Sequence, residues 1–97
     1  MINLKLHYGP AFTPLTKTTG EVLNFEEELS LSELFEYYYD KYGDKFKELI
    51  WDKTKKDKFH KQLVIILNGK TYRGPNFLKT PLKDGDDLSF LYVYFGG

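Results

Sequence analysis

The first 28 residues alternate apolar and polar side chains over two stretches. Residues 2–8 follow a period of two throughout, which predicts a half-buried β-strand, and residues 21–28 indicate a second strand. Residues 9–20 contain two prolines and four threonines and are expected to form a loop. Strands joined by a loop are usually antiparallel neighbours, so these two are expected to pair. The expected inward positions are Ile2, Leu4, Leu6, Leu23 and Phe25.

A helical period replaces the alternation after residue 29. Ser30 and Glu33 are spaced as a capping box at its start, and Gly43 suits the position that ends a helix. Tyr37 and Tyr39, which lie beside the apolar stripe, are expected in the core and at its edge rather than on a binding face. The stripe itself follows the spacing of one helix face and consists of Leu31, Leu34, Phe35, Tyr38 and Tyr42.

The segment after Gly43 combines a short apolar pattern with a run of lysines. Asp44 is expected to cap a short second helix, whose apolar positions are Phe46, Leu49 and Ile50. Residues 52–61 carry five lysines, at positions 53, 55, 56, 58 and 61. A patch that binds RNA or phosphate requires a wider basic surface, and the formal net charge of zero gives no support for one. We therefore expect a solvated loop or hairpin here.

The C-terminal third contains the most apolar strand of the chain. Residues 63–67 are all apolar, with β-branched residues at the centre, which predicts a strand buried on both faces. Asn68-Gly69 is a strong signal for a hairpin turn, so residues 70–72 are expected to return as a short strand. The last strand is expected over residues 88–94.

Together these elements predict a two-layer α+β domain that spans residues 1–97. One main helix packs on a mixed sheet of four or five strands. The long helical return between the second and third strands is compatible with a parallel pair somewhere in the sheet. The pattern leaves open which strands form that pair.

Composition argues against several classes of function. The formal net charge of zero gives no electrostatic support for binding nucleic acid or membrane, and no apolar run reaches the length of a membrane helix. Without cysteine, the chain has no disulfide, thiolate metal site or cysteine nucleophile, and the cytoplasm is the expected compartment. His7 and His60 stand at no recognisable metal-ligand spacing, so neither a metal site nor an autonomous active site is expected.

The sequence finishes on Gly96-Gly97, directly after the strand-like run of residues 88–95. Glycine has no Cβ, so such a tip can enter a narrow site and present a carboxylate there. A carboxylate is a poor acyl donor, but a second enzyme can convert it to an acyl-adenylate, which a sulfur nucleophile then attacks. Gly97 is therefore the candidate reactive residue, and residues 96–97 are expected to form an exposed functional tail. The alternative is a chain end without a role.

Three stretches carry a resemblance to a known family. Residues 82–90, Leu-Lys-Asp-Gly-Asp-Asp-Leu-Ser-Phe, together with the terminal diglycine, resemble the end of the small subunit of molybdopterin synthase. That family, MoaD, belongs with ThiS among the ubiquitin-like sulfur carriers. Residues 31–42 are similar to the family helix, and residues 42–49 with 63–69 resemble its longer members. The resemblance covers most of the chain and is weakest over residues 9–20.

The resemblance implies a β-grasp (ubiquitin-like) fold with the first and last strands parallel at the sheet centre. It also implies that a ubiquitin-activating-type adenylating enzyme uses ATP on Gly97, and that sulfur delivery then produces a thiocarboxylate. A second implied partner is the large subunit of molybdopterin synthase, which receives the tail and supplies the catalytic side chains. The chain itself is then not an enzyme, contains no catalytic residue and binds no cofactor or metal.

The residues before the diglycine depart from the family pattern. Molybdopterin-type members carry Pro-Pro-Val and a small residue there, whereas this chain reads Tyr92, Val93, Tyr94 and Phe95. Loss of the prolines makes the tail less stiff, and the large ring of Phe95 must fit the receiving channel. The superfamily assignment stands, but the partner stays open. A thiamine-type carrier, a protein modifier joined to lysines through Gly97, and an interaction module with an idle tail are the alternatives.

Strand alternation suggests a second surface of interest near the tail. If Phe90 faces the helix, then Leu91, Val93 and Phe95 lie on the opposite face of the sheet. An exposed apolar stripe of this kind often marks an interface, so these three residues are the candidate partner-docking patch. The alternative is that loops of the same chain cover Leu91 and Val93.

Overall fold

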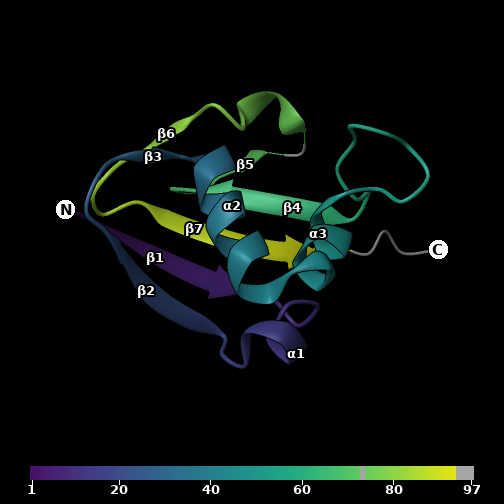
Figure 1. Ribbon diagram of the computed structural model, residues 1–97, viewed down its shortest axis with the longest axis horizontal. Helices are drawn as coiled ribbons and strands as arrows, with labels where there is room; N and C mark the ends of the chain where they lie inside the picture. Colours follow the sequence, from purple (N-terminus) through teal and green to yellow (C-terminus); the bar gives the residue numbers. More distant parts are fainter. Residues whose placement is uncertain (73, 94–97) are drawn as a thin grey trace.

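A computed structural model of the chain describes residues 1–72 and 74–93, which form two layers (Figure 1). A five-stranded sheet makes one layer, and the helix α2 lies across one of its faces with α3 beside it. The α+β class, the mixed sheet and the single main helix are thus confirmed. The elements are β1 (Ile2–Tyr8), α1 (Thr13–Thr16), β2 (Gly20–Phe25), β3 (Leu29–Ser30), α2 (Leu31–Tyr42), α3 (Asp44–Ile50), β4 (Leu63–Leu67), β5 (Lys70–Tyr72), the 3-10 helix η1 (Pro75–Phe77), β6 (Pro81–Leu82) and β7 (Asp87–Tyr92).

The strand order of the sheet is β2-β1-β7-β4-β5, so the last strand lies at its centre. β1 and β7 are parallel, with Leu6 opposite Leu88 and Tyr8 opposite Phe90, and every other neighbouring pair is antiparallel. This is the parallel pairing of first and last strands that a β-grasp fold implies. A separate two-stranded sheet of β3 and β6, in which Leu29 faces Leu82, was not foreseen from the sequence.

The boundaries of α2 agree with the sequence signals. The Ser30 hydroxyl accepts a hydrogen bond from the Glu33 amide at 3.2 Å, and the Glu33 carboxylate accepts one from the Ser30 amide at 2.9 Å. Gly43 ends the helix at a φ of 72°, a conformation that favours glycine. The predicted cap at Asp44 is wrong, because α3 begins at Asp44 and Gly43 takes the capping position without a side-chain hydrogen bond.

Phe90 on β7 is fully buried at the centre of the core. The segment 9–20, predicted to be a loop, contains the short helix α1 and also contributes a fully buried ring through Phe12, just before α1. A single aromatic residue gives no periodic signal, so the sequence could not reveal this role. The rings that surround Phe90 at centroid distances of 5.7–6.4 Å are those of Tyr8, Phe12, Phe35, Tyr38 and Phe46.

The last strand is shorter than predicted. β7 ends at Tyr92, which pairs with Leu63, the first residue of β4. Because β4 offers no earlier partner, the ladder stops there, and the pairing continues with a backbone bond from the Val93 amide to the Gln62 carbonyl at 2.9 Å. Tyr94 lies outside the described residues.

A polar cluster links the sheet to α2. The Tyr8 hydroxyl donates to a Glu21 carboxylate oxygen at 2.6 Å and lies 2.7 Å from the Tyr38 hydroxyl. Burial is the main cause that raises the pKa of both tyrosines above the ordinary value, and the nearby carboxylate adds to it. The folded state therefore disfavours ionisation of either hydroxyl.

We predict that Phe90→Ala destabilises the fold by about 3–5 kcal/mol, because it leaves a ring-sized cavity among five aromatic side chains. Urea denaturation measures the change in the free energy of unfolding. Val22→Ala is the control, because the Val22 side chain is 57% exposed and its loss is expected to cost no more than about 0.5 kcal/mol. Equal effects of the two substitutions would contradict the central position of Phe90.

Alkaline pH provides a test of the tyrosine cluster. The folded state raises the pKa values of Tyr8 and Tyr38. The stability that the two neutral hydroxyls give to the folded state is therefore fully present below the ordinary pKa of 10.0. It is lost as the pH rises above that value, by up to about 1.4 kcal/mol per pH unit for each tyrosine. Unfolding free energies of wild type and Tyr8→Phe, compared across this range, are expected to show a flatter decline for the variant. Identical slopes would refute the assignment.

Candidate functional site

The candidate site is the point at which the chain leaves the sheet, at Tyr92 and Val93. We call these two residues the tail root. Gly96 and Gly97, the predicted tail, and Phe95, part of the predicted docking patch, lie outside the described residues. The structure therefore describes the base that carries the tail.

Tyr92 is fixed from three directions. Its hydroxyl donates to the Leu49 carbonyl of α3 at 2.5 Å. Its ring stacks on the His60 imidazole at a centroid distance of 4.6 Å and meets the Phe12 ring edge-on at 5.6 Å. Together with the bond from Val93 to Gln62, these contacts hold the tail root against α3, the segment before α1 and the connection that precedes β4.

Residues 52–61 form a folded loop beside the tail root, which we call the lysine loop. The Asp52 carboxylate accepts hydrogen bonds from the Thr54 amide at 2.7 Å, the Thr54 hydroxyl at 2.8 Å and the Lys55 amide at 3.0 Å. These bonds, led by the one from the Thr54 amide, lower the Asp52 pKa. At the base of the loop, Trp51 and Phe59 form an isolated β-bridge. The expectation of a loop or hairpin is confirmed.

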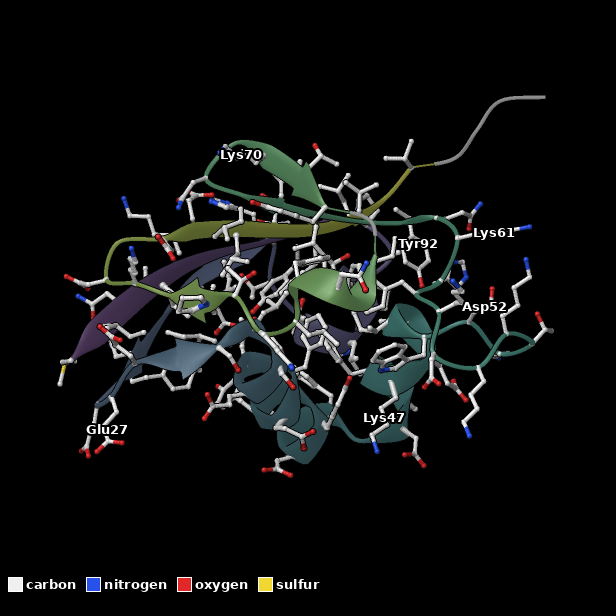
Figure 2. All side chains as sticks on the ribbon, turned by 90° about the horizontal axis from the view of Figure 1, so that it is seen from above. Glu27, Lys47, Asp52, Lys61, Lys70 and Tyr92 are labelled. Carbon is white, nitrogen blue, oxygen red and sulfur yellow. The ribbon has the colours of Figure 1, made fainter. Side chains whose placement is uncertain are left out.

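A hollow of about 690 Å³ separates α3 from the lysine loop and reaches Tyr92. Figure 2 shows Lys61, Asp52 and Tyr92 at the same end of the molecule. The hollow is open to solvent and mixes cationic, anionic and apolar groups. Its lining includes Lys45, Glu48, Leu49, Lys53, Lys55 and His60.

The face of the sheet away from α2 carries the predicted docking residues that the structure describes. Leu88 and Phe90 are buried against the helices, so Leu91 points to the opposite face, where its strand partner is Val64. Leu91 and Val93 are each half-buried. They are therefore neither a fully exposed apolar stripe nor fully covered by loops of the same chain. Gly9 packs closely against Leu91 and covers part of its side chain, since a Cβ at Gly9 would lie 2.9 Å from the Leu91 Cβ.

The histidines do not assemble a metal site. His7 lies on the open face of β1, and its Nε2 is 3.1 Å from a carboxylate oxygen of Asp87. His60 accepts a hydrogen bond at Nδ1 from the Gln62 amide at 3.1 Å, near the tail root. Within residues 1–72 and 74–93, no group of three or more His, Asp or Glu side chains is arranged to hold a metal ion. The contact between His7 and Asp87 was not foreseen, because the two residues lie far apart in the sequence.

The ThiS family model matches residues 12–97, which cover most of the chain. The chain belongs to the ThiS family. This finding confirms the resemblance noted from residues 31–42 and 82–90. No curated protein matches the chain.

Solved structures of related folds agree with this membership in the ThiS family. A Pyrococcus furiosus protein named molybdopterin converting factor subunit 1 has a TM-score of 0.68 at 21% identity, over 97% of this chain and all of that one. The small archaeal modifier protein 1 of Methanosarcina acetivorans has a TM-score of 0.69 at 22% identity, over 100% and 98%. A chain of the Amycolatopsis orientalis BexX/CysO complex has a TM-score of 0.69 at 18% identity, over 97% and 99%.

These likenesses establish a ubiquitin-like β-grasp fold for this ThiS-family chain. Family and fold together make it a ubiquitin-like member of the ThiS family, and small carriers of the ThiS and MoaD type are generally non-catalytic. Among the helices of the described segments, none has the length and apolar character that a transmembrane helix requires.

We predict that Gly9→Ala destabilises the fold by about 1–3 kcal/mol, because the new methyl group meets the Cβ and Cα of Leu91 at 2.9 and 3.2 Å. Gly74→Ala is the matched control, since no atom of the described residues, chain neighbours aside, lies within 4 Å of a Cβ at that position, and about 0.5 kcal/mol or less is expected. Thermal unfolding compares the two. If Gly9→Ala unfolds at the wild-type temperature, then β7 can move away from the added methyl group at little cost in free energy.

Proposed function

We propose that this ThiS-family chain is a sulfur carrier whose reactive group is the carboxylate of Gly97, and that it donates sulfur in molybdopterin biosynthesis. A ubiquitin-activating-type adenylating enzyme supplies the activation. A Gly97 carboxylate oxygen attacks the α-phosphate of ATP, pyrophosphate leaves, and a mixed anhydride with AMP forms. A sulfide-level nucleophile then attacks the carbonyl carbon, AMP leaves, and the product is a thiocarboxylate. ATP is the partner's substrate, and this chain binds no cofactor.

The single observation that carries the proposal is the family match, which extends through the glycines at the end of the sequence. The geometry supports it in a second way. The strand that leads to the tail is the central strand of the sheet, and Tyr92 is fixed by a hydrogen bond and two ring contacts. Because the tail root is already held in place, less conformational entropy is lost when a partner binds the residues beyond it.

Molybdopterin synthesis is proposed as the pathway on two grounds. The segment 82–90 resembles the small subunit of molybdopterin synthase, and the Pyrococcus furiosus protein of similar fold is named for the same system. The large subunit of that synthase is then the second partner and provides the side chains that catalyse sulfur transfer. Its channel must accept Phe95 in place of the small residue found in molybdopterin-type members. This chain is expected in the cytoplasm.

A protein modifier is the second candidate, and the similarity to a small archaeal modifier protein favours it. The activation step is the same, but the amine of a target lysine attacks the activated carbonyl and an isopeptide bond forms. A thiamine-type carrier differs from the leading proposal only in the acceptor of the sulfur. The fate of the activated Gly97 therefore separates carrier from modifier.

Intact-mass spectrometry of the protein isolated from its own cells tests the proposal. Replacement of one oxygen by sulfur at Gly97 is expected for a carrier. Larger species that end in a Gly-Gly-modified lysine would favour the modifier. If neither species is found, the protein is incubated with ATP and the adenylating enzyme of the same cell. Failure to form an adenylate there would leave only an interaction module with an idle tail.

We predict that Gly97→Ala folds like the wild type but is adenylated much more slowly, because a methyl group obstructs a narrow partner site. Pyrophosphate exchange with the adenylating enzyme measures activation, and thermal unfolding confirms the fold. Lys70→Ala, at an exposed position on β5, is the control with unchanged activation. Adenylation of Gly97→Ala at the wild-type rate would overturn the stated reason for glycine at this position.

A further inference from the structure

The formal net charge of zero conceals two regions of opposite charge. Residues 21–44 contain eight carboxylates and one lysine, whereas residues 45–61 contain seven lysines and three carboxylates. Glu27 and Lys61, one from each region, lie at opposite ends of the molecule (Figure 2). The basic region is therefore a local patch, although the total charge is balanced.

The lysine loop brings this patch to the tail root. Lys53, Lys55 and Lys61 line the hollow that Tyr92 also borders, and Lys45 of α3 joins them. The Gln62 carbonyl, directly after the loop, holds the Val93 amide at 2.9 Å. A partner that receives the residues beyond Val93 must therefore pass close to these ammonium groups.

The charges of the loop are available to a partner. All five lysine side chains of residues 52–61 are exposed, and within residues 1–72 and 74–93 none of them pairs with a carboxylate. Two carboxylates lie in the loop: Asp57 is exposed, and Asp52 engages its Oδ1 with the Thr54 and Lys55 amides and the Thr54 hydroxyl. The Asp52 carboxylate is thereby held by the backbone of the loop instead of by its lysines.

The loop also holds these charges on a fixed frame. Phe59 is buried and meets the Trp51 ring edge-on at a centroid distance of 5.0 Å. The Asp52 amide donates to the Lys58 carbonyl at 2.8 Å, and the His60 amide donates to the Ile50 carbonyl at 2.7 Å. A pre-formed charged surface binds with a smaller loss of conformational entropy than a disordered one.

We propose that the lysine loop docks on an acidic surface of the adenylating enzyme, beside the opening that receives the tail. This inference rests on the proposed function, since it names the contact that brings Gly97 to its activating partner. Charge complementarity of this kind speeds association and selects partners. RNA is the less suitable occupant, because residues 21–44 carry a formal net charge of −7 and repel a polyanion.

The test is a charge reversal of the loop, Lys53→Glu combined with Lys55→Glu and Lys58→Glu. Pyrophosphate exchange is measured against carrier concentration with the adenylating enzyme of the same cell, at several salt concentrations. We expect the KM for the carrier to rise about tenfold at low salt, with kcat unchanged and a weaker dependence on salt than in the wild type. The matched control reverses three exposed lysines elsewhere, at positions 70, 79 and 83, and is expected to change KM less than about twofold.

The outcomes distinguish the inference from the function on which it rests. If the wild type supports exchange and the two triple variants have equal KM values, docking through the loop is overturned. The proposed function then stays intact. Absence of exchange with the wild type would overturn the proposed function, and the docking inference with it. Binding of a labelled single-stranded RNA by the wild type, lost on reversal of the loop lysines, would assign the loop to nucleic acid instead. Thermal unfolding of both triple variants verifies that they are folded.

Discussion

The packing of Phe90 in the central strand is the interaction on which the rest of the structure depends. β7 pairs with β1 in parallel and with β4 in antiparallel orientation, so the C-terminal strand joins the two halves of the sheet. The Phe90 ring then joins side chains from β1, α2, α3 and the segment before α1. A contact between the two ends of the sequence thus organises the core, which gives this small domain many long-range contacts.

The same strand determines how the tail is presented. In the molybdopterin-type pattern that residues 82–90 resemble, proline before the diglycine is expected to stiffen the tail, because it restricts φ directly. Here Tyr92 is held instead by its hydrogen bond to Leu49 and by its contacts with His60 and Phe12. Both solutions lower the freedom of the tail root, but the contacts of Tyr92 couple it to α3 and to the lysine loop. A partner that binds the loop therefore acts close to the base of the tail.

Residues 31–42 and 63–72 illustrate what the sequence predicts well. A capping box, a turn glycine and an apolar stripe are local signals, and the helix and hairpin that they predict are present. Phe12, the pair β3–β6 and the contact between His7 and Asp87 were missed, because each depends on residues brought together only by the fold. A net charge of zero does not show where the charges lie: Glu27, from residues 21–44, and Lys61, from residues 45–61, are at opposite ends of the molecule (Figure 2). The docking residue Phe95 and the glycines of the tail lie outside the described residues and stay predictions.

Activation chemistry alone does not distinguish one carrier from another, because every candidate in this class presents the same terminal glycine carboxylate. A channel that admits Gly-Gly admits the tips of all of them, so the discrimination between carriers must come from the residue before the diglycine, here Phe95, and from surfaces beside the tail. In this chain two such surfaces flank the tail root: the half-buried Leu91 and Val93 on the open face of the sheet, and the lysines of residues 52–61. Apolar contact contributes affinity with little selectivity, whereas an arrangement of like charges also repels unsuitable partners. The choice between a molybdopterin pathway and protein modification is therefore expected to depend on the lysine loop more than on the glycines that react.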